Sequence, residues 1–274
     1  MIIWLASYPK SGNTWIRLFL NTLLYTNNEL NINNIKIEQF PNKKHYKNIL
    51  NNFSDLEGVI KNSLNAQYSI NLDNNIKFFK THSSYWKSKI GNFTNNDNTL
   101  GVIYIVRDPR NVITSLKKHF GKKSYEDTLA FMQDQRKFLV SKYFKNENDV
   151  PTLISSWSNN YKSWKKFKKN YFLIKYENLL TDSKKEFINL INFIKNISDL
   201  KFDKNQIEKV IYDCNFENLK KLENQKGFVE ASKDSDQNFF SLGPDNNWKK
   251  ILSADLCRKI ENSFKDEMKE LDYL

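Results

Sequence analysis

Cysteine is scarce in this sequence, and long apolar stretches are missing from it. The two cysteines, Cys214 and Cys257, lie far apart in segments with a helical pattern. This spacing argues against a disulfide framework and a CxxC metal site, so a reduced, cytoplasmic compartment is expected. No apolar run approaches the ~20 residues that a membrane-spanning helix needs, and the opening MIIWLAS lacks the charged region of a secretory signal. We therefore expect neither a secretion signal nor a membrane span.

Acidic residues are the minority among the charged side chains. The chain has 31 Asp and Glu against 43 Lys and Arg, for a formal net charge of +12. Such a charge attracts anionic partners without saying which anion is bound. Many lysines fall in Lys/Asn-rich stretches such as NKKHYKN and SWKKFKKN, and biased composition explains these as well as a binding surface does. No nucleic-acid recognition motif accompanies them, so no nucleic-acid partner is expected.

Short apolar runs alternate with amphipathic stretches along the chain. The runs that favour strands are residues 2 to 7, 76 to 80, 100 to 106 and 171 to 176. The patterns that favour helices are residues 14 to 25, a segment capped by Asp108 with Pro109 at its first position, a stretch opened by Thr181, a segment after the capping box of Asp203 and Gln206, and residues 253 to 271. There is no internal repeat.

This alternation predicts an α/β fold with a central, mostly parallel β-sheet flanked by helices. We expect a single domain over residues 1–274. Ligands of such sheets bind beyond the carboxyl ends of the strands. Residues 28 to 72, 84 to 99 and 121 to 150 are polar and irregular, which indicates loops or short helices over an active site.

The segment WLASYPKSGNTWIRLFL carries the strongest functional signal. A strand turns sharply into a helix here, and the first backbone N–H groups of the helix favour a bound phosphate-like anion. Gly12 permits close approach of the backbone, while the side chains of Lys10, Ser11, Asn13 and Thr14 add a cation and short donors. The nucleotide-triphosphatase pattern GxxxxGK[ST] is absent. An ordinary turn with a surface lysine is the alternative.

Two further segments place charged groups at strand ends. In YIVRDPRNVITS, Arg107 ends an apolar run and Ser115 follows on the next helix, so both can reach one phosphate. In IKFFKTH, Lys80 and His82 are two positions apart and point to the same side of a strand. Of the three histidines, His45, His82 and His119, only His82 stands where a strand opens on the site. Structural roles for Arg107, as a partner of Asp108, and for His82 remain open.

YPKSGNTW resembles the 5′-phosphosulfate loop YPKSGTxW of sulfotransferases that use 3′-phosphoadenosine 5′-phosphosulfate (PAPS), with Asn13 in place of threonine. The resemblance implies the P-loop-like, three-layer fold of that family. It also implies that Lys10 contacts the oxygen bridging sulfate and phosphate and that Trp15 stacks on adenine. Residues Ser11, Gly12, Asn13 and Thr14 would hold the 5′-phosphate.

The other segments are similar to family motifs as well. VRDPRN…S is similar to VRDPRDxxxS, which implies that Arg107 and Ser115 bind the 3′-phosphate. KTH is similar to the segment that supplies the general base, here His82. By the same resemblance, Tyr176 in YENL contacts the adenine edge and Phe216 packs against the adenine.

The likeness weakens toward the carboxyl end. The family pattern RKGxxGxWK matches at Gly243 and Trp248, but Ser241 and Leu242 stand where its two cations should be. Arg107 and Ser115 would then need a lysine such as Lys226 or Lys233 to neutralise the 3′-phosphate, or PAPS affinity is reduced. The dimer motif KxxxTVxxxE is also absent, because Ser253, Ala254 and Arg258 replace its threonine, valine and glutamate. Dimerisation by that motif is not expected.

The resemblance implies transfer of a sulfuryl group from PAPS to a hydroxyl or amine, with 3′-phosphoadenosine 5′-phosphate (PAP) as product and no metal. His82 would take the acceptor proton, while Lys10 and Lys80 would stabilise charge on the transferring group. The acceptor is expected to be a small molecule; a carbohydrate or glycolipid is the alternative. Two other classes stay open: a P-loop kinase or NTPase, and a non-catalytic polyanion-binding protein.

Overall fold

The computed structural model describes residues 1–53, 55–139, 150–231, 238–240, 243 and 246–274. The chain divides into two compact units. The first contains Met1–Pro9, Ile37–Val106 and Ala130–Leu173, and the second contains Lys10–Lys36, Arg107–Leu129 and Ile174–Leu274. Each unit is therefore assembled from segments far apart in the sequence.

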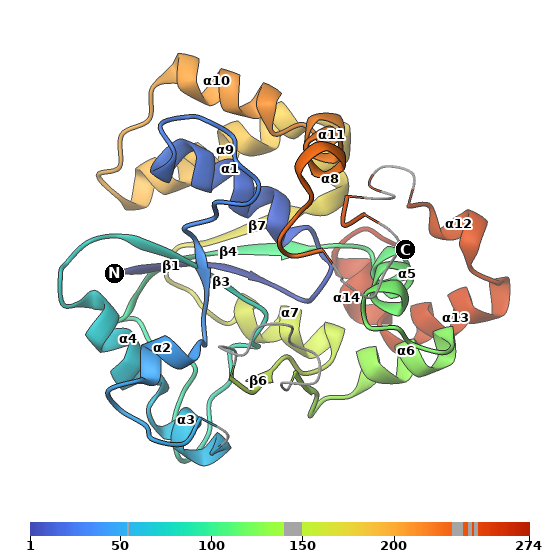
Figure 1. The fold of residues 1–274 in the computed structure, drawn as a ribbon. Helices are drawn as coiled ribbons and strands as arrows, with labels where there is room; N and C mark the ends of the chain where they lie inside the picture. The colour runs from blue at the N-terminus through green and yellow to red at the C-terminus, as the bar shows by residue number, and fades with distance from the viewer. Residues whose placement is uncertain (54, 140–149, 232–237, 241–242, 244–245) are drawn as a thin grey trace. The chain divides into compact units, whose positions relative to one another are not determined.

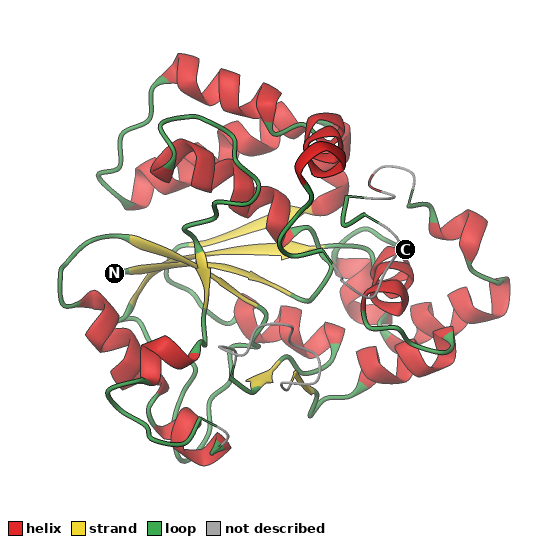
Figure 2. Cartoon of the chain, viewed as in Figure 1, coloured by secondary structure: helices red, strands yellow, loops and turns green. Residues whose placement is uncertain are grey.

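A five-stranded sheet with the order β2-β3-β1-β4-β7 belongs to the first unit, apart from the last two residues of β7 (Figures 1 and 2). In chain order its strands are β1 (Ile2–Ser7), β2 (Glu38–Gln39), β3 (Lys77–Thr81), β4 (Thr99–Val106) and β7 (Tyr171–Lys175). β1 pairs in parallel with both β3 and β4, with Ala6 opposite Thr81 and Tyr104. The carboxyl ends of these three strands therefore share one edge of the sheet.

The apolar runs form strands that are buried on both faces. All residues from Ile2 to Ala6 are 0% exposed, as a parallel strand covered on both sides requires. Trp4 anchors an aromatic core, with ring centroids 5.4 Å from Phe40, 5.2 Å from Phe93 and 6.5 Å from Trp164. Helix α7 (Trp157–Lys165), which carries Trp164, packs against β1 and β4.

Short elements make up the rest of the first unit. They are α2 (Lys43–Tyr46), α3 (Leu56–Lys61), α4 (Ser63–Asn71) and the antiparallel pair β5 (Phe138–Leu139) and β6 (Thr152–Leu153). Helix α6 (Tyr125–Gln133) contributes residues up to Leu129 to the second unit and the residues from Ala130 onward to the first. Short helices in the polar stretch from residue 28 to 72 agree with the sequence expectation.

The second unit consists of helices. They are α1 (Asn13–Tyr25), α5 (Pro109–His119), α8 (Tyr176–Thr181), α9 (Ser183–Ile197), α10 (Lys204–Asp213), α11 (Phe216–Lys226), α12 (Trp248–Ile251), α13 (Ala254–Ser263) and α14 (Lys265–Glu270). α1 lies beside α10, and α10 beside α9 (Figure 1). Phe19 of α1 stacks on Phe187 of α9 with centroids 3.9 Å apart, which buries the apolar faces of both helices.

Most expected elements are confirmed to within a residue. The side chain of Asp108 caps α5 by accepting the N–H of Arg110, with Pro109 at the first helical position. The side chain of Asp203 likewise accepts the N–H of Gln206 at the start of α10. The predicted α/β class with a parallel sheet is confirmed. The expectation of a single domain stays a prediction. Among the described residues, no helix is both long and apolar enough to cross a bilayer.

Two boundary predictions are wrong. Thr181 ends α8, and α9 begins after Asp182, because the Asp182 carboxylate accepts the N–H of Lys185 and is the better cap. β7 ends within a residue of its predicted end, and Tyr176 is the first residue of α8. The predicted helix from 253 to 271 is broken at Phe264, which leaves helical geometry (φ −126°, ψ 23°) and is buried.

Candidate active site

The turn between β1 and α1 has the geometry of an anion cradle. Lys10 has φ 67° and Gly12 has φ 99°, so both lie in the left-handed region. Gly12 is the N-cap of α1, and a Cβ at this position would lie 2.3 Å from Cδ2 of Tyr176. Only glycine fits here, because the backbone conformation and the aromatic neighbour both exclude a side chain. The turn thus presents the N-terminus of a 13-residue helix, which favours negative charge.

Ser11 adds a polar atom that needs a partner. Its residue is 1% exposed, and within the described part of the chain its Oγ has no hydrogen-bond partner. A buried hydroxyl without a partner costs free energy, so such a group usually meets a ligand or ordered water. Asn13 and Thr14 are buried in the first turn of α1 beside it. The predicted cradle residues therefore fit a phosphate-like anion.

Arg107 lies at the same cradle within the second unit. Its Nη1 donates to the backbone carbonyl of Lys10 at 3.3 Å, and its guanidinium carbon is 4.2 Å from the centroid of the Tyr176 ring. The residue is 6% exposed. Among the described residues, Arg107 forms no ion pair, and its Nε has no hydrogen-bond partner. The two turns that were predicted to bind phosphate therefore meet, and in the described part of the chain no acid pairs with this guanidinium.

The neighbouring acid is neutralised by a different arginine. Both carboxylate oxygens of Asp108 accept hydrogen bonds from Arg110, the shortest at 2.8 Å, and Arg110 also donates to Glu261 at 2.7 Å. The Arg110 guanidinium carbon lies 4.0 Å from the centroid of the Trp248 ring. The pairing of Arg107 with Asp108, which the sequence left open, does not occur.

Tyr176 connects the predicted nucleotide-binding residues. Its ring contacts Gly12 and Arg107, and its centroid is 6.1 Å from that of Trp15, which it meets edge-on. Burial raises the pKa of the Tyr176 phenol, so it stays protonated at neutral pH. Trp15 is also fixed, because its indole N–H donates to the carbonyl of Cys214 at 2.6 Å. The roles of both rings toward adenine stay predictions.

Phe216 and Gly243, which the sequence assigned to the nucleotide separately, lie in contact, and their roles toward the nucleotide stay predictions. A Cβ on Gly243 would lie 2.0 Å from Cζ of Phe216, so the glycine backbone rests on the ring. Phe240 extends this cluster with a centroid 6.3 Å from that of Phe216. The adjacent Phe239 has its ring centroid 4.3 Å from Nζ of Lys10. The rings of Phe240 and Phe239 therefore connect Phe216 to Lys10 of the phosphate cradle.

Glu223 holds this aromatic segment in place. Its carboxylate accepts the N–H groups of Phe239 at 2.6 Å and Phe240 at 2.7 Å. Sequence reasoning missed Glu223, Phe239 and Phe240. The paired phenylalanines just before the degraded RKG-like segment were the available signal for them.

The other residues predicted near the 3′-phosphate are Ser115 and a lysine, either Lys226 or Lys233. Ser115 is half-buried on α5, close in sequence to Thr114, whose hydroxyl donates to Oδ1 of Asn246 at 2.8 Å. Lys226 is exposed at the end of α11. Lys233, Ser241 and Leu242 lie outside the described residues. The second cation for a 3′-phosphate therefore stays a prediction.

His82 follows the carboxyl end of β3 in the first unit, with Lys80 two residues before it. Nδ1 of His82 is 2.9 Å from the carbonyl oxygen of Ser7 and 3.2 Å from its hydroxyl. A carbonyl oxygen only accepts, so this contact requires a proton on Nδ1 and leaves the lone pair of the neutral ring on Nε2. That is the tautomer that a proton-accepting histidine needs.

A buried asparagine supports the backbone of His82. Asn160 of α7 is 0% exposed, and its amide donates to the carbonyls of His82 at 3.0 Å and Ile154 at 2.8 Å. Its own carbonyl accepts the hydroxyl of Tyr104 at 2.8 Å. No sequence pattern indicated this contact, because Asn160 and His82 are 78 positions apart.

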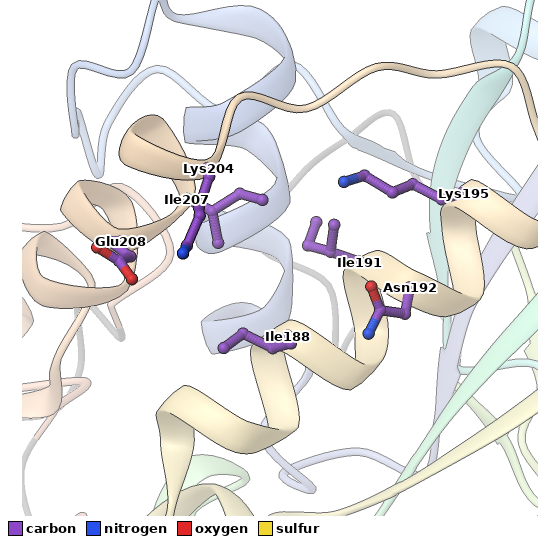
Figure 3. Close-up of a pocket in the computed structure, with 7 residues that line it drawn as sticks. All are labelled: Ile188, Ile191, Asn192, Lys195, Lys204, Ile207 and Glu208. Atoms are coloured by element: carbon purple, nitrogen blue, oxygen red, sulfur yellow. The ribbon is translucent and has the colours of Figure 1, made fainter.

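An apolar pocket of about 270 Å³ lies elsewhere on the second unit, between α9 and α10 (Figure 3). Its walls include Ile188, Ile191 and Ile207, and none of the predicted site residues lines it. In the described ranges, no group of three or more His, Cys, Asp or Glu side chains is placed to hold a metal ion.

Curated relatives resemble this chain over most of its length. Sulfotransferase 1E1 of Homo sapiens is 23% identical, over 97% of this chain and 83% of the relative. Cytosolic sulfotransferase 8 of Arabidopsis thaliana is 22% identical, over 93% and 73%. Flavonol 3-sulfotransferase of Flaveria bidentis is 24% identical, over 97% and 81%.

Solved structures share the fold. Mouse sulfotransferase SULT7A1, complexed with PAP, superposes with a TM-score of 0.62 at 18% identity, over 99% of this chain and 84% of that one. Retinol dehydratase in complex with androsterone and inactive cofactor PAP gives a TM-score of 0.56 at 17% identity, over 98% and 80%. Residues 2–272 match the sulfotransferase domain family. A match that spans nearly the whole chain shows that this protein belongs to the sulfotransferase family.

Proposed function

We propose that this protein transfers a sulfuryl group from PAPS to the hydroxyl or amine of a small-molecule acceptor. The observation that carries the proposal is Arg107, a buried guanidinium that hydrogen-bonds the Lys10 backbone and rests on Tyr176 while Asp108 pairs with Arg110. A permanent charge kept away from its neighbouring acid is suited to a phosphate. This phosphate would be the 3′-phosphate, which distinguishes PAPS from ordinary nucleotides.

The cradle fits the other end of the donor. The helix N-terminus, the buried Ser11 hydroxyl and the exclusion of any side chain at Gly12 leave room and donors for the 5′-phosphosulfate group. Trp15, Tyr176 and Phe216 would hold the adenine, with Gly243 against Phe216. When bound, PAPS supplies an activated sulfuryl group on a phosphate leaving group.

His82 is proposed as the general base. Nε2 would take the proton of the acceptor hydroxyl while the acceptor oxygen forms its bond to sulfur and the bond from sulfur to the 5′-phosphate oxygen breaks. Lys10 and Lys80 would stabilise the negative charge that builds on the transferring group and on the leaving phosphate. The hydrogen bond from Nδ1 of His82 to Ser7 supports this assignment, because it fixes the required tautomer.

Similar proteins support the donor and the acceptor class. Solved neighbours are complexes with PAP, and two of them also contain androsterone or retinol, which are small molecules. Relatives are named for flavonols. We therefore favour a small hydroxylated acceptor over a carbohydrate or glycolipid. A cytoplasmic location is part of the proposal and is supported by relatives named cytosolic sulfotransferases.

A calorimetric titration with PAP and with AMP tests the donor. PAP should bind about 10-fold to 100-fold more tightly, because its additional phosphate gains charged hydrogen bonds worth ~1.5–3 kcal/mol. Equal affinities for the two nucleotides would rule out PAPS as the donor. A screen with labelled PAPS against phenols, alcohols, amines and sugars then identifies the acceptor. Label transfer to sugars alone would overturn the proposed acceptor class.

A further inference from the structure

The carboxyl end of the chain reaches the turn that follows Arg107. Tyr273 donates its phenolic O–H to Oε2 of Glu177 at 2.7 Å, and its backbone carbonyl accepts from Nη2 of Arg110 at 2.6 Å. Its own N–H donates to the carbonyl of Met268 at 2.8 Å. Lys175 lies with Nζ 4.9 Å from the ring centroid. Side chain and backbone of Tyr273 are therefore both held in place.

Glu177 connects this tyrosine to the backbone beside Arg107. Its second oxygen, Oε1, accepts the N–H of Asp108 at 3.0 Å. Asp108 follows Arg107 directly, and Tyr176, which supports the Arg107 guanidinium, precedes Glu177 directly. The Glu177 carboxylate thus connects the peptide after Arg107 to α8, the helix that carries the Tyr176 ring.

Glu177 is also an acid that can compete for Arg107. Burial raises the pKa of this carboxyl, while the N–H of Asp108, the Tyr273 hydroxyl and the nearby charge of Arg107 all lower it. The Tyr273 hydroxyl therefore satisfies one oxygen of a half-buried carboxylate close to the arginine. Without the Tyr273 hydroxyl, Oε2 of Glu177 would lack a donor and would turn to the Arg107 guanidinium, whose charge already acts on this carboxylate. Arg107 is the residue proposed to bind the 3′-phosphate.

We propose that Tyr273 is a positioning residue for the 3′-phosphate subsite, keeping Glu177 away from Arg107 and holding the turn that carries it. This inference rests on the proposed use of PAPS. The proposal assigns the tyrosine no contact with the reacting atoms or the nucleotide, and its hydroxyl acts through Glu177.

Titrations of the Tyr273→Phe variant with PAP and with AMP test the inference. The variant should bind PAP about 10-fold more weakly than the unaltered protein, while AMP, which lacks the 3′-phosphate, should change by less than about 2-fold. Tyr212→Phe is the matched control. It removes the same hydroxyl from a tyrosine that lies on α10 and is 71% exposed. It should bind both nucleotides like the unaltered protein.

A second variant separates positioning from folding. In Tyr273→Phe with Glu177→Gln, the amide oxygen still accepts the N–H of Asp108 but no charge competes for Arg107, so PAP affinity should recover to within about 3-fold. If PAP affinity does not recover in the double variant, or if Tyr273→Phe weakens PAP and AMP binding equally, the role of Tyr273 is merely structural. An unchanged PAP preference in Tyr273→Phe would overturn the inference while leaving the donor intact. If the unaltered protein itself shows no preference for PAP, the proposed function fails and the inference fails with it.

Discussion

A buried arginine next to an aspartate ordinarily pairs with it. In this protein the aspartate pairs with the arginine two positions further on, and Asp108 and Arg110 are 5% and 7% exposed. Breaking such a buried pair leaves an uncompensated charge, which costs several kcal/mol. The pairing is therefore stable, and it leaves Arg107 available to a ligand. At the scale of single residues, the binding capacity of Arg107 is decided by its neighbours.

His82 carries the prediction at this scale. His82→Ala should lower kcat by at least about 100-fold with an acceptor found by the screen, because a positioned general base contributes about 100-fold to 10,000-fold. PAP affinity, measured by calorimetry, should change by less than about 2-fold. The control is His119→Ala at the end of α5, which should keep both values. Equal losses of turnover and nucleotide affinity would contradict the role of His82 as base.

Among the elements, the turn from β1 into α1 has the strictest requirements. Gly12 has a positive φ and no space for a Cβ, whereas Gly121 has a positive φ of 57° and nothing within 4 Å of the position that a Cβ would take. The two glycines therefore separate the cost of backbone conformation from the cost of steric overlap. Both lie in the second unit.

Gly12→Ala is predicted to destabilise the protein by about 3 kcal/mol and to weaken PAP binding by at least about 10-fold, because the methyl group displaces Tyr176 from beneath Arg107. Gly121→Ala should cost only about 1 kcal/mol, which is the cost of the left-handed conformation, and leave PAP binding unchanged. Urea unfolding and calorimetry measure the two effects. Similar values for both variants would show that the contact between Gly12 and Tyr176 does not constrain the site.

For the whole molecule, one buried histidine affects stability in acid. His45 stacks on Phe40 with centroids 5.2 Å apart, and its side chain is 5% exposed. Neither ring nitrogen has a hydrogen-bond partner within the described ranges, although Nε2 is 3.9 Å from Oε2 of Glu38. Burial, helped by the charge of Lys44, lowers the pKa of His45 to about 4.

This pKa predicts a loss of stability between pH 6.5 and pH 4. The unfolded chain binds the proton near pH 6.5 and the folded protein only near pH 4, so the contribution of His45 is complete above pH 6.5 and falls as the pH decreases. At pH 5 the loss is about 2 kcal/mol. Urea unfolding of the unaltered protein and of His45→Phe at pH 7.5 and pH 5 measures it. Between pH 7.5 and pH 5, the free energy of unfolding should fall by about 2 kcal/mol less in His45→Phe than in the unaltered protein. Equal decreases in the two proteins would contradict the prediction.

Local patterns in the sequence determine the strands, the glycine turn and the helix caps of this protein. Each depends on residues within a few positions, as with Asp203 capping the N–H of Gln206. The sequence also placed Lys10, Arg107 and Tyr176 at element ends, where the structure brings them together in the second unit. Helix ends were less predictable, because Phe264 breaks its helix in order to reach the core.

Only the tertiary structure decided which groups support these residues. Glu177 and Tyr273 are 96 positions apart, and Asn160 and His82 are 78 apart. No local periodicity encodes such contacts, because they form only when separate helices and strands pack and leave buried polar atoms that must be paired. The sequence therefore determined which side chains we propose as ligands of a doubly phosphorylated nucleotide. Packing determined that Asp108 pairs with Arg110 and not with Arg107.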